Sequence, residues 1–387
     1  MNKTYVLGAI VVIVLIGGIF LALSSRDANV SGEMDTPLMT TDTYKEKVYV
    51  ALEGEGKVAV IDTKSTKVIA TIDLSETGDG EIVRYMAHNV QVTPDGKKVL
   101  VTANVEEGME MEDGDMPHED DMEHGQKSDK LIVIDPVMDK IIDSISVDTD
   151  SHLAHVVTSP DARIAYVASQ EKSKVYLINI ENGEVMREVV IGEASGPHGL
   201  RVSPDGSEVY IALIDGKAMA ILDTKTNNVR NIALPGAGVQ TAVTPDGMYA
   251  FSSVYDTKQI AWLNRGSNEQ GLISLPEGSR GPVQIYSTPG SRYLYVADQG
   301  YYFDQPTGNL VYRIDIGRKV VDQTITAGSA PHGIVVSEDG TRAYVTNLLG
   351  DDVSVIDTNT NKEISKIPVG DMPNGISIWN GENKIIN

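Results

Sequence analysis

The chain of 387 residues contains no cysteine. This absence excludes disulfide bonds, thiolate metal sites, covalent attachment of a c-type haem and lipid attachment at cysteine. Phenylalanine and tryptophan are scarce as well, with three and two residues against sixteen tyrosines. Since 41% of the residues are hydrophobic and many of these are Val or Ile, the composition favours strands over a helical bundle, and the core must be stabilised by packing.

Positive charge is also scarce, because 32 Lys and Arg residues stand against 55 Asp and Glu residues, for a net charge of -23. Binding to nucleic acid or to an anionic lipid surface depends on Lys and Arg side chains that displace counterions from phosphates. We therefore expect neither nucleic acid nor anionic lipid as a partner.

The first 24 residues contain a long hydrophobic run. Tyr5 to Leu23 is uncharged over nineteen residues, which at about 1.5 Å per helical residue nearly spans a hydrocarbon core of roughly 30 Å. Lys3 precedes the run, so the positive-inside tendency keeps this end in the cytoplasm and exports the rest of the chain. Residues 1–24 are predicted to form a transmembrane anchor. The alternative is a cleaved signal peptide, because Ala22 and Ser24 are small residues at plausible cleavage spacing.

Residues 25–44 are polar and lack apolar periodicity, which is typical of a flexible stalk. Asn29-Val30-Ser31 within this segment is a glycosylation sequon. Together with the anchor, the stalk predicts that residues 45–387 lie at the cell surface or in the periplasm, held at the cytoplasmic membrane by the N-terminal helix.

One pattern recurs from about residue 45 onward. A tight turn such as Ser203-Pro204-Asp205-Gly206 precedes a β run such as Val209 to Ala212, and a polar loop leads to a second β run that ends in Asp or Asn, here Asp223. The residue that ends the second run recurs at spacings of 73, 44, 44, 41, 51 and 42 residues: Asp62, Asp135, Asn179, Asp223, Asn264, Asp315 and Asp357. The pattern predicts seven small antiparallel sheets.

The two ends of the repeat region complement each other. The first unit lacks the turn and opens directly with Lys47-Val48-Tyr49-Val50, whereas the chain ends with a spare strand, Gly375 to Trp379. We expect the two ends to share one sheet, because this join closes a ring and removes exposed sheet edges. The predicted fold class is an all-β seven-bladed β-propeller with an N-terminal transmembrane or signal helix. A linear solenoid is the alternative.

The last complete unit contains Tyr344-Val345-Thr346-Asn347 followed by Val355-Ile356-Asp357-Thr358. This segment resembles the YVTN family of β-propeller repeats, and weaker copies cover nearly everything after the stalk. The resemblance implies a propeller, distantly similar to the copper-cluster domain of nitrous oxide reductase and the haem-d1 domain of cytochrome cd1 nitrite reductase. This chain departs from both, since it has too few histidines for that cluster and no cysteine for a cupredoxin copper site or an attached haem c.

Four histidines precede the repeated turns. We letter the four strands of a blade A to D, with the Pro-Asp-Gly turn joining A to B, so that antiparallel alternation places the D-to-A and B-to-C loops on one face. Three D-to-A loops carry a histidine seven residues before the turn Asp: His88, His198 and His332. His155 lies six residues before its Asp, so it joins the set only through a bulge and is its weakest member. Strand A is innermost in propellers that this chain resembles, which implies that these imidazoles converge at the mouth of the central channel.

Converging neutral imidazoles favour a site for copper, zinc, iron or nickel. The alternative is that Pro197-His198-Gly199 and Pro331-His332-Gly333 are structural turns of the repeat, whose histidines bond to the backbone.

The 73-residue spacing contains an acidic insertion, residues 105–128, which the repeat pattern assigns to a B-to-C loop. Glu106 to His124 contains ten acidic residues and neither Lys nor Arg. The same stretch supplies thioether and imidazole ligands, from Met109, Met111, Met116, Met122, His118 and His124. This mixture favours the capture of copper. The alternative is a solvated acidic loop without a ligand.

A second insertion, Gln299 to Gly308, also falls in a B-to-C loop and carries Tyr301, Tyr302 and Phe303. Aromatic residues on an exposed loop often mark a contact surface. We expect this loop to wall the channel mouth on another side.

Three functions follow from these features. The first is a membrane-anchored surface module that binds an extracellular protein, glycan or small ligand, because the fold implies no catalysis and the repeats show no nucleophile and base arrangement. The second is a copper-binding propeller for metal storage, transfer or redox work. The third is a lactonase-like hydrolase, since some enzymes of that class use similar propellers; its candidate residues are His88, His198 and His332.

Overall fold

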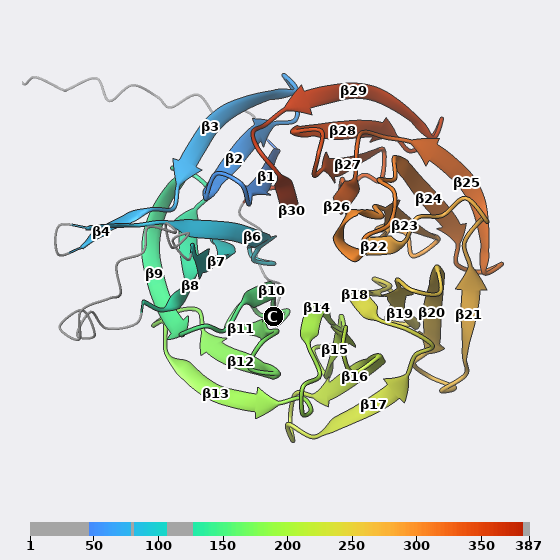
Figure 1. Ribbon diagram of the computed structural model, residues 1–387, viewed down its shortest axis with the longest axis horizontal. Helices are drawn as coiled ribbons and strands as arrows, with labels where there is room; N and C mark the ends of the chain where they lie inside the picture. Colours follow the sequence, from blue (N-terminus) through green and yellow to red (C-terminus); the bar gives the residue numbers. More distant parts are fainter. Residues whose placement is uncertain (1–45, 79–80, 107–126, 382–387) are drawn as a thin grey trace, which may run out of the picture. The chain divides into compact units, whose positions relative to one another are not determined.

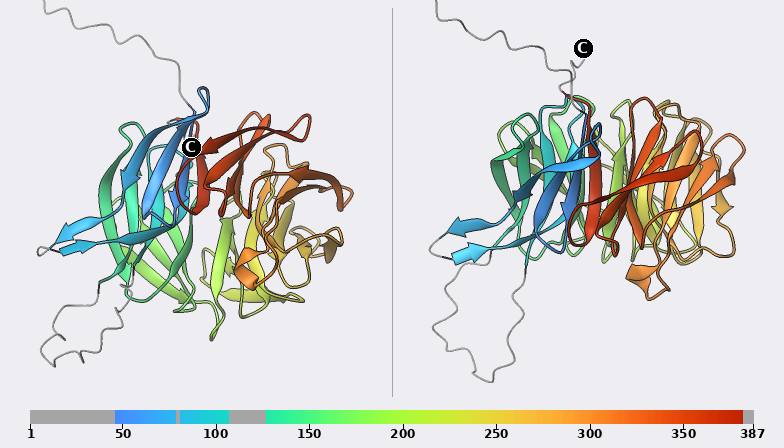
Figure 2. Two further views of the ribbon diagram at one scale, coloured as in Figure 1. Left: turned by 45° about the horizontal axis from the view of Figure 1, so that its top comes forward. Right: turned by 90° about the horizontal axis from the view of Figure 1, so that it is seen from above.

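Seven four-stranded antiparallel sheets surround a common axis in the computed structural model, which describes residues 46–78, 81–106 and 127–381 (Figure 1). Each sheet is one blade, and the strand nearest the axis is called its innermost strand. The side views show the strands running between two faces of the ring (Figure 2). Among the described residues, the single helical element is the short 3₁₀ helix η2 (Tyr301–Phe303).

The strands of the first four blades, from the axis outward, have the following bounds. Blade 1 contains β30 (Pro373–Trp379), β1 (Lys47–Leu52), β2 (Lys57–Asp62) and β3 (Lys67–Asp73). Blade 2 contains β6 (Tyr85–Val92), β7 (Val99–Val105), β8 (Asp129–Asp135) and β9 (Lys140–Asp148). Blade 3 contains β10 (Leu153–Thr158), β11 (Ile164–Ser169), β12 (Lys174–Asn179) and β13 (Val185–Val190). Blade 4 contains β14 (Pro197–Val202), β15 (Glu208–Leu213), β16 (Ala218–Asp223) and β17 (Val229–Ala233).

The remaining three blades follow the same order. Blade 5 contains β18 (Gly238–Val243), β19 (Tyr249–Val254), β20 (Gln259–Asn264) and β21 (Gln270–Ser274). Blade 6 contains β22 (Pro282–Ser287), β23 (Tyr293–Asp298), β24 (Leu310–Asp315) and β25 (Val320–Thr326). Blade 7 contains β26 (Pro331–Val336), β27 (Arg342–Asn347), β28 (Asp352–Asp357) and β29 (Lys362–Pro368). All seven predicted run-ending residues are the last residues of the third strands, so the count of seven blades is confirmed.

The ring closes in blade 1, as the two ends of the repeat region predicted. Strand β30, dark red in Figure 1, pairs with the blue strand β1 in antiparallel register, with Lys47 opposite Trp379 and Tyr49 opposite Ser377. The Trp379 indole N–H donates to the Gly96 carbonyl in blade 2 at 2.7 Å. Each innermost strand also contacts the innermost strand of the next blade, from β30 round to β26 and back to β30. The linear solenoid is therefore excluded.

Packing between adjacent blades forms the core. The second strand of most blades carries a buried aromatic residue five positions after the third residue of the A-to-B turn. Tyr210, five residues after Asp205, and Tyr344, five after Asp339, are examples. The apolar clusters combine residues of neighbouring blades; Ala168 and Val175 of blade 3, for example, pack with Ile211 of blade 4. The outermost strands alternate instead between exposed and covered residues, because one of their faces meets water.

The first repeat spacing is long for two reasons, and the sequence pattern indicated one of them. The connection from β7 to β8 is where the repeat pattern places the acidic insertion, and residues 107–126 of this connection lie outside the described residues. The connection from β3 to β6 also contains an unpredicted hairpin, β4 (Glu76–Gly78) paired with β5 (Glu81–Val83). The hairpin and the insertion together account for the length of the first spacing.

The predicted anchor and all but the last residue of the predicted stalk lie in the unit Met1–Thr43, which is distinct from the unit Tyr44–Asn387. Residues 1–45 are outside the described part of the chain. Within residues 46–78, 81–106 and 127–381, no helix has the length and apolar character needed to cross a membrane.

Candidate metal centre

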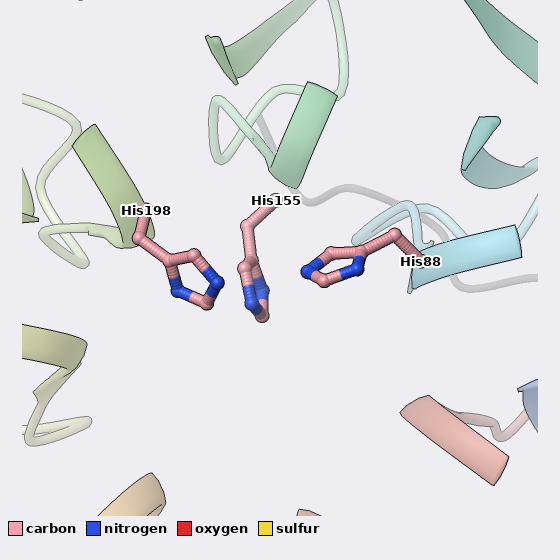
Figure 3. Close-up of side chains that lie close together, drawn as sticks. All are labelled: His88, His155 and His198. Atoms are coloured by element: carbon pink, nitrogen blue, oxygen red, sulfur yellow. The ribbon is translucent and has the colours of Figure 1, made fainter. Parts of the chain in front are cut away.

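Three histidines from three consecutive blades meet near the ring axis. His88 lies on β6, His155 on β10 and His198 on β14, and one ligand nitrogen of each lies within 4.8 Å of the others. All three side chains are buried. Figure 3 shows the three rings close together, and their centroids form a triangle with sides of 4.8 Å (His155 to His198), 5.6 Å (His88 to His155) and 5.6 Å (His88 to His198).

A β-bulge near the start of every innermost strand explains this convergence. In β14 the paired residues are Pro197 and Leu200, so His198 and Gly199 form the bulge. The two residues of a bulge oppose one residue of the partner strand, and the bulge re-aims their side chains. Gly199 is needed here because a Cβ would lie 2.2 Å from Gln240 Oε1 of the next blade.

The bulge corrects the expected membership of the site. In β10 the bulge contains Ala154 and His155, so the histidine takes the second bulge position instead of the first and still reaches the axis. His155, expected to be the weakest member of the set, belongs to the close group with His88 and His198. His332 matches the sequence offset of His88 and His198, but it is not part of the close group of three.

A carboxylate orients the His88 ring. His88 Nδ1 lies 3.2 Å from Glu53 Oε1, and Glu53 Oε2 accepts hydrogen bonds from Asn374 Nδ2 at 2.6 Å and from the Tyr302 hydroxyl at 3.0 Å. His88 Nε2 is buried and has no hydrogen-bond partner among the described residues. A histidine whose Nδ1–H donates to a carboxylate presents the lone pair of Nε2, which is the usual arrangement of a metal-bound imidazole.

The other two rings are also held by neighbours. His198 Nδ1 lies 2.9 Å from the Val239 carbonyl, so this nitrogen carries the proton and Nε2 is left as the acceptor. The side-chain amides of Gln240 and Gln284 flank His155, with Gln240 Nε2 3.5 Å from Nδ1 and Gln284 Nε2 3.2 Å from Nε2. An ion bound to either nitrogen of His155 replaces one of these two contacts.

Burial determines the protonation of the histidines. Burial, with the neighbouring His88, lowers the pKa of His198 to about 3, and it lowers the pKa of both His332 and His152 to about 4. The pKa of His155 is held well below its ordinary value by burial and by His198. These four imidazoles are therefore neutral near pH 7, and neutral imidazole is the form that binds a metal.

The charge of Glu53 persists beside them. Burial raises the pKa of this carboxyl, but the neighbouring His88 and the hydrogen bonds from His88, Asn374 and Tyr302 outweigh burial and lower the pKa to about 2. The centre thus places the neutral imidazoles of His155 and His198 near one fixed negative charge, that of Glu53.

The chain matches no protein-family model and no curated protein. Among solved structures it is similar to hydrazine synthase from Kuenenia stuttgartiensis, with a TM-score of 0.60 and 18% identity over 84% of this chain and 99% of that chain. This likeness is one of fold. At such identity it supports the β-propeller and transfers neither ligand nor reaction, and the YVTN motif stays a resemblance.

The three histidines fit a metal ion after small adjustments. Two nitrogens that bind one ion at about 2.0–2.1 Å are at most about 4.2 Å apart. The ligand nitrogens here lie within 4.8 Å of one another. Ring rotations that shift each nitrogen by a few tenths of an ångström therefore bring all three to bonding distance of one ion. The buried Nε2 of His88, without a partner among the described residues, is the atom that such an ion satisfies.

His332 lies on another side of the mouth, beside the Gln299 to Gly308 loop. Its Nδ1 is 2.8 Å from Gln299 Nε2, and its ring centroid is 5.7 Å from that of Tyr302. Tyr302 also reaches Glu53, which confirms that this loop, carrying η2, walls the mouth. Phe303 instead stacks on Tyr255, with ring centroids 3.7 Å apart.

Sequence reasoning missed two residues of the centre. The ring centroids of His152 and His88 are 5.5 Å apart, and His152 immediately precedes β10, the strand that carries His155. Glu53 follows β1 in a B-to-C loop and belongs to no motif. The predicted ligands Met109, Met111, Met116, Met122, His118 and His124 lie outside the described residues.

Proposed function

We propose that this chain is a metal-binding β-propeller that holds one transition-metal ion between His88, His155 and His198. The observation that carries the proposal is the convergence of three buried imidazoles, from three blades, with ligand atoms within 4.8 Å of one another. Buried polar atoms are normally paired, so a buried ring nitrogen without a partner points to a missing ligand.

Copper is the favoured ion. Three neutral imidazoles suit copper, zinc, iron and nickel alike, whereas thioether ligands select Cu(I). The acidic insertion supplies four thioethers and two further imidazoles in a loop that leaves β7 on the histidine face, the face on which the D-to-A and B-to-C loops lie. We infer that the insertion collects copper and that the three histidines store it or pass it on, on the outer side of a membrane to which residues 1–24 anchor the chain.

An acidic cavity supports this route. A cavity of about 460 Å³ lies against blades 1 and 2, and its lining is acidic on balance, with Glu53, Glu55, Asp73 and Glu106 against Lys57 and Arg84. Glu53 forms part of the cavity wall and also contacts His88, while Glu106 immediately precedes the insertion. Carboxylates raise the local concentration of cations, so the cavity favours their approach to the histidines.

Metal analysis tests the proposal directly. Protein purified without chelator is expected to contain about one copper or other transition-metal ion per chain, and the metal-free protein to bind Cu(I) or Cu(II) with the same stoichiometry. Protein that contains no metal and binds neither copper ion nor Zn(II) would remove the proposal.

Replacing Glu53 by glutamine is expected to weaken metal binding about tenfold. The amide keeps an oxygen near His88 Nδ1 but loses the charge, and the loss of such an outer contact typically costs about 10–100-fold in metal affinity. Competition against a chromophoric chelator measures the change. Glu55→Gln is the matched control, because Glu55 lines the same cavity but bonds to Lys57 and to the Asp371 N–H. An equal loss of affinity in both variants would contradict a specific role for Glu53.

Replacing residues 107–126 by a short Gly-Ser linker is expected to slow copper uptake by on the order of tenfold, because the acidic residues no longer concentrate the cation near the centre. The midpoint of thermal unfolding should change little, since the insertion lies between β7 and β8. Stopped-flow transfer from a chelator measures the rate. A variant in which the four methionines become leucine separates thioether ligation from charge, and unfolding on deletion would contradict the placement of the loop.

A surface binding module is the second candidate, and the exposed rings of Tyr301 and Tyr302 favour it. They lie on the loop that walls the mouth, where a partner can reach them. Capture of one defined extracellular protein or glycan by the wild type, and its loss in Tyr301→Ser with Tyr302 unchanged, would support this role. Lactonase-like hydrolysis at the centre stays a prediction, which assay of lactone substrates tests.

A further inference from the structure

A second cavity lies at the end of the ring axis near the A-to-B turns, away from the histidine bulges. Its volume is about 350 Å³. Five of the seven innermost strands supply to its lining the residue that stands four positions before the third residue of the A-to-B turn, namely Gln91, Val157, Arg201, Tyr286 and Val335. Strand β30, which no such turn follows, supplies Ile376. One charged side chain, Arg201, therefore stands in a ring of otherwise uncharged residues.

Arg201 has no acidic partner among the described residues. Its one hydrogen bond runs from Nη1 to the carbonyl of its neighbour Leu200 at 3.1 Å. No Asp or Glu is present in the lining of the cavity, although the chain has 55 of them. Other partly covered arginines are paired: Arg265 with Asp205 and Glu208, and Arg313 with Asp322 at 2.8 Å.

An unpaired cation in this position is costly, because burial removes water from the guanidinium and nothing charged replaces it. Burial lowers the pKa of Arg201, and Tyr286 is the one neighbour that raises it. Burial raises the pKa of Tyr286, and the nearby Arg201 offsets part of this rise. The two side chains therefore lie close enough to interact. A residue kept at such a cost fits a role in binding better than a role in stability.

We propose that this cavity binds a small organic carboxylate, with the Arg201 guanidinium as its ionic partner and the Tyr286 hydroxyl beside it. The planar guanidinium offers parallel N–H donors that match the two oxygens of a carboxylate. Val157, Val335 and Ile378 supply apolar walls for a short hydrocarbon chain. These walls favour an organic carboxylate over a fully hydrated inorganic anion such as phosphate, and the volume suits a small ligand.

Calorimetric titration of the full propeller with acetate, butyrate, hexanoate and phosphate at constant ionic strength tests the proposal. We expect a single site whose affinity rises from acetate to hexanoate, because each added methylene is removed from water. The titration is repeated in the His155→Ala variant, which separates this cavity from carboxylate binding at a metal ion. Equal binding in that variant supports the second site, and loss of binding there contradicts it.

Arg201→Met is expected to weaken carboxylate binding at least tenfold and Arg201→Lys by less, since lysine keeps the charge without the fork. Arg318→Met, on an exposed turn, is the matched control. Arg201→Met should unfold at the same or a higher temperature, because it removes an unpaired cation. Unchanged binding in Arg201→Met, lower stability of that variant, or binding of phosphate alone would overturn the proposal. Binding that appears only in a chain truncated after Gly381 would mean that carboxylates of residues 382–387 occupy the cavity, and it would also overturn the proposal.

Discussion

Replacing His155 by alanine is expected to weaken metal binding more than about 100-fold. The ring centroid of His155 lies 4.8 Å from that of His198 and 5.6 Å from that of His88, so its removal takes away one of the three ligands and leaves two. Loss of an outer contact alone typically costs about 10–100-fold in affinity, and loss of a direct ligand costs more. Competition titration with Cu(I), Cu(II) and Zn(II) measures the effect.

His332→Ala is the informative control for this experiment. His332 shares the sequence offset of His88 and His198, yet it pairs with Gln299 and lies outside the close group of three. We expect its replacement to change affinity by less than about threefold, because it removes no ligand from the centre. A large loss in His332→Ala with little change in His155→Ala would contradict the assignment and favour the grouping expected from the sequence offsets.

Ending the chain at Met372 is expected to abolish the folded monomer. The truncation removes β30, which supplies the innermost strand of blade 1 and contacts the innermost strands on both sides. It exposes the edge of β1 and uncovers a core in which Val48, Tyr49 and Val50 are fully buried. Because a folded domain is stabilised by only about 5–15 kcal/mol, loss of the closing strand leaves too little to maintain the ring.

Circular dichroism and size-exclusion chromatography measure this outcome, with thermal unfolding of the wild type for comparison. A chain that ends at Gly381 is the matched control, because it keeps β30 and the hydrogen bond from Trp379 to Gly96. The control is expected to fold as the full chain does. A monomer without β30 that unfolds at the same temperature as the wild type would show that closure in blade 1 contributes little.

The architecture could be predicted from the sequence because its signals are local and repeated. A tight turn, a β run and a terminal Asp or Asn recur in almost every unit, so one misread copy does not change the count. The unmatched segments at Lys47 and at Trp379 then indicated the closure, since the two deficits complement each other. The β4–β5 hairpin was missed because its strands are three residues each, shorter than most strands that a sequence pattern reveals.

The candidate centre could be predicted only in part, because its geometry depends on tertiary structure. His155 stands six residues before its turn Asp and the other histidines seven, which set His155 apart in the sequence. A bulge that occurs in all seven innermost strands nevertheless brings both His155 and His198 to the axis. Glu53 meets His88 and Asn374 across 35 and 321 residues of sequence. No local pattern marks such a residue, and the closed ring alone brings it into place.

Anomalous X-ray scattering from crystals of the propeller, recorded at the absorption edge of the bound metal, tests the central claim most directly. The account predicts one strong peak near the ring axis, about 2.0–2.1 Å from one nitrogen each of His88, His155 and His198. Absence of a peak there in copper-loaded protein, or a peak bound by His332 without His155, would contradict it.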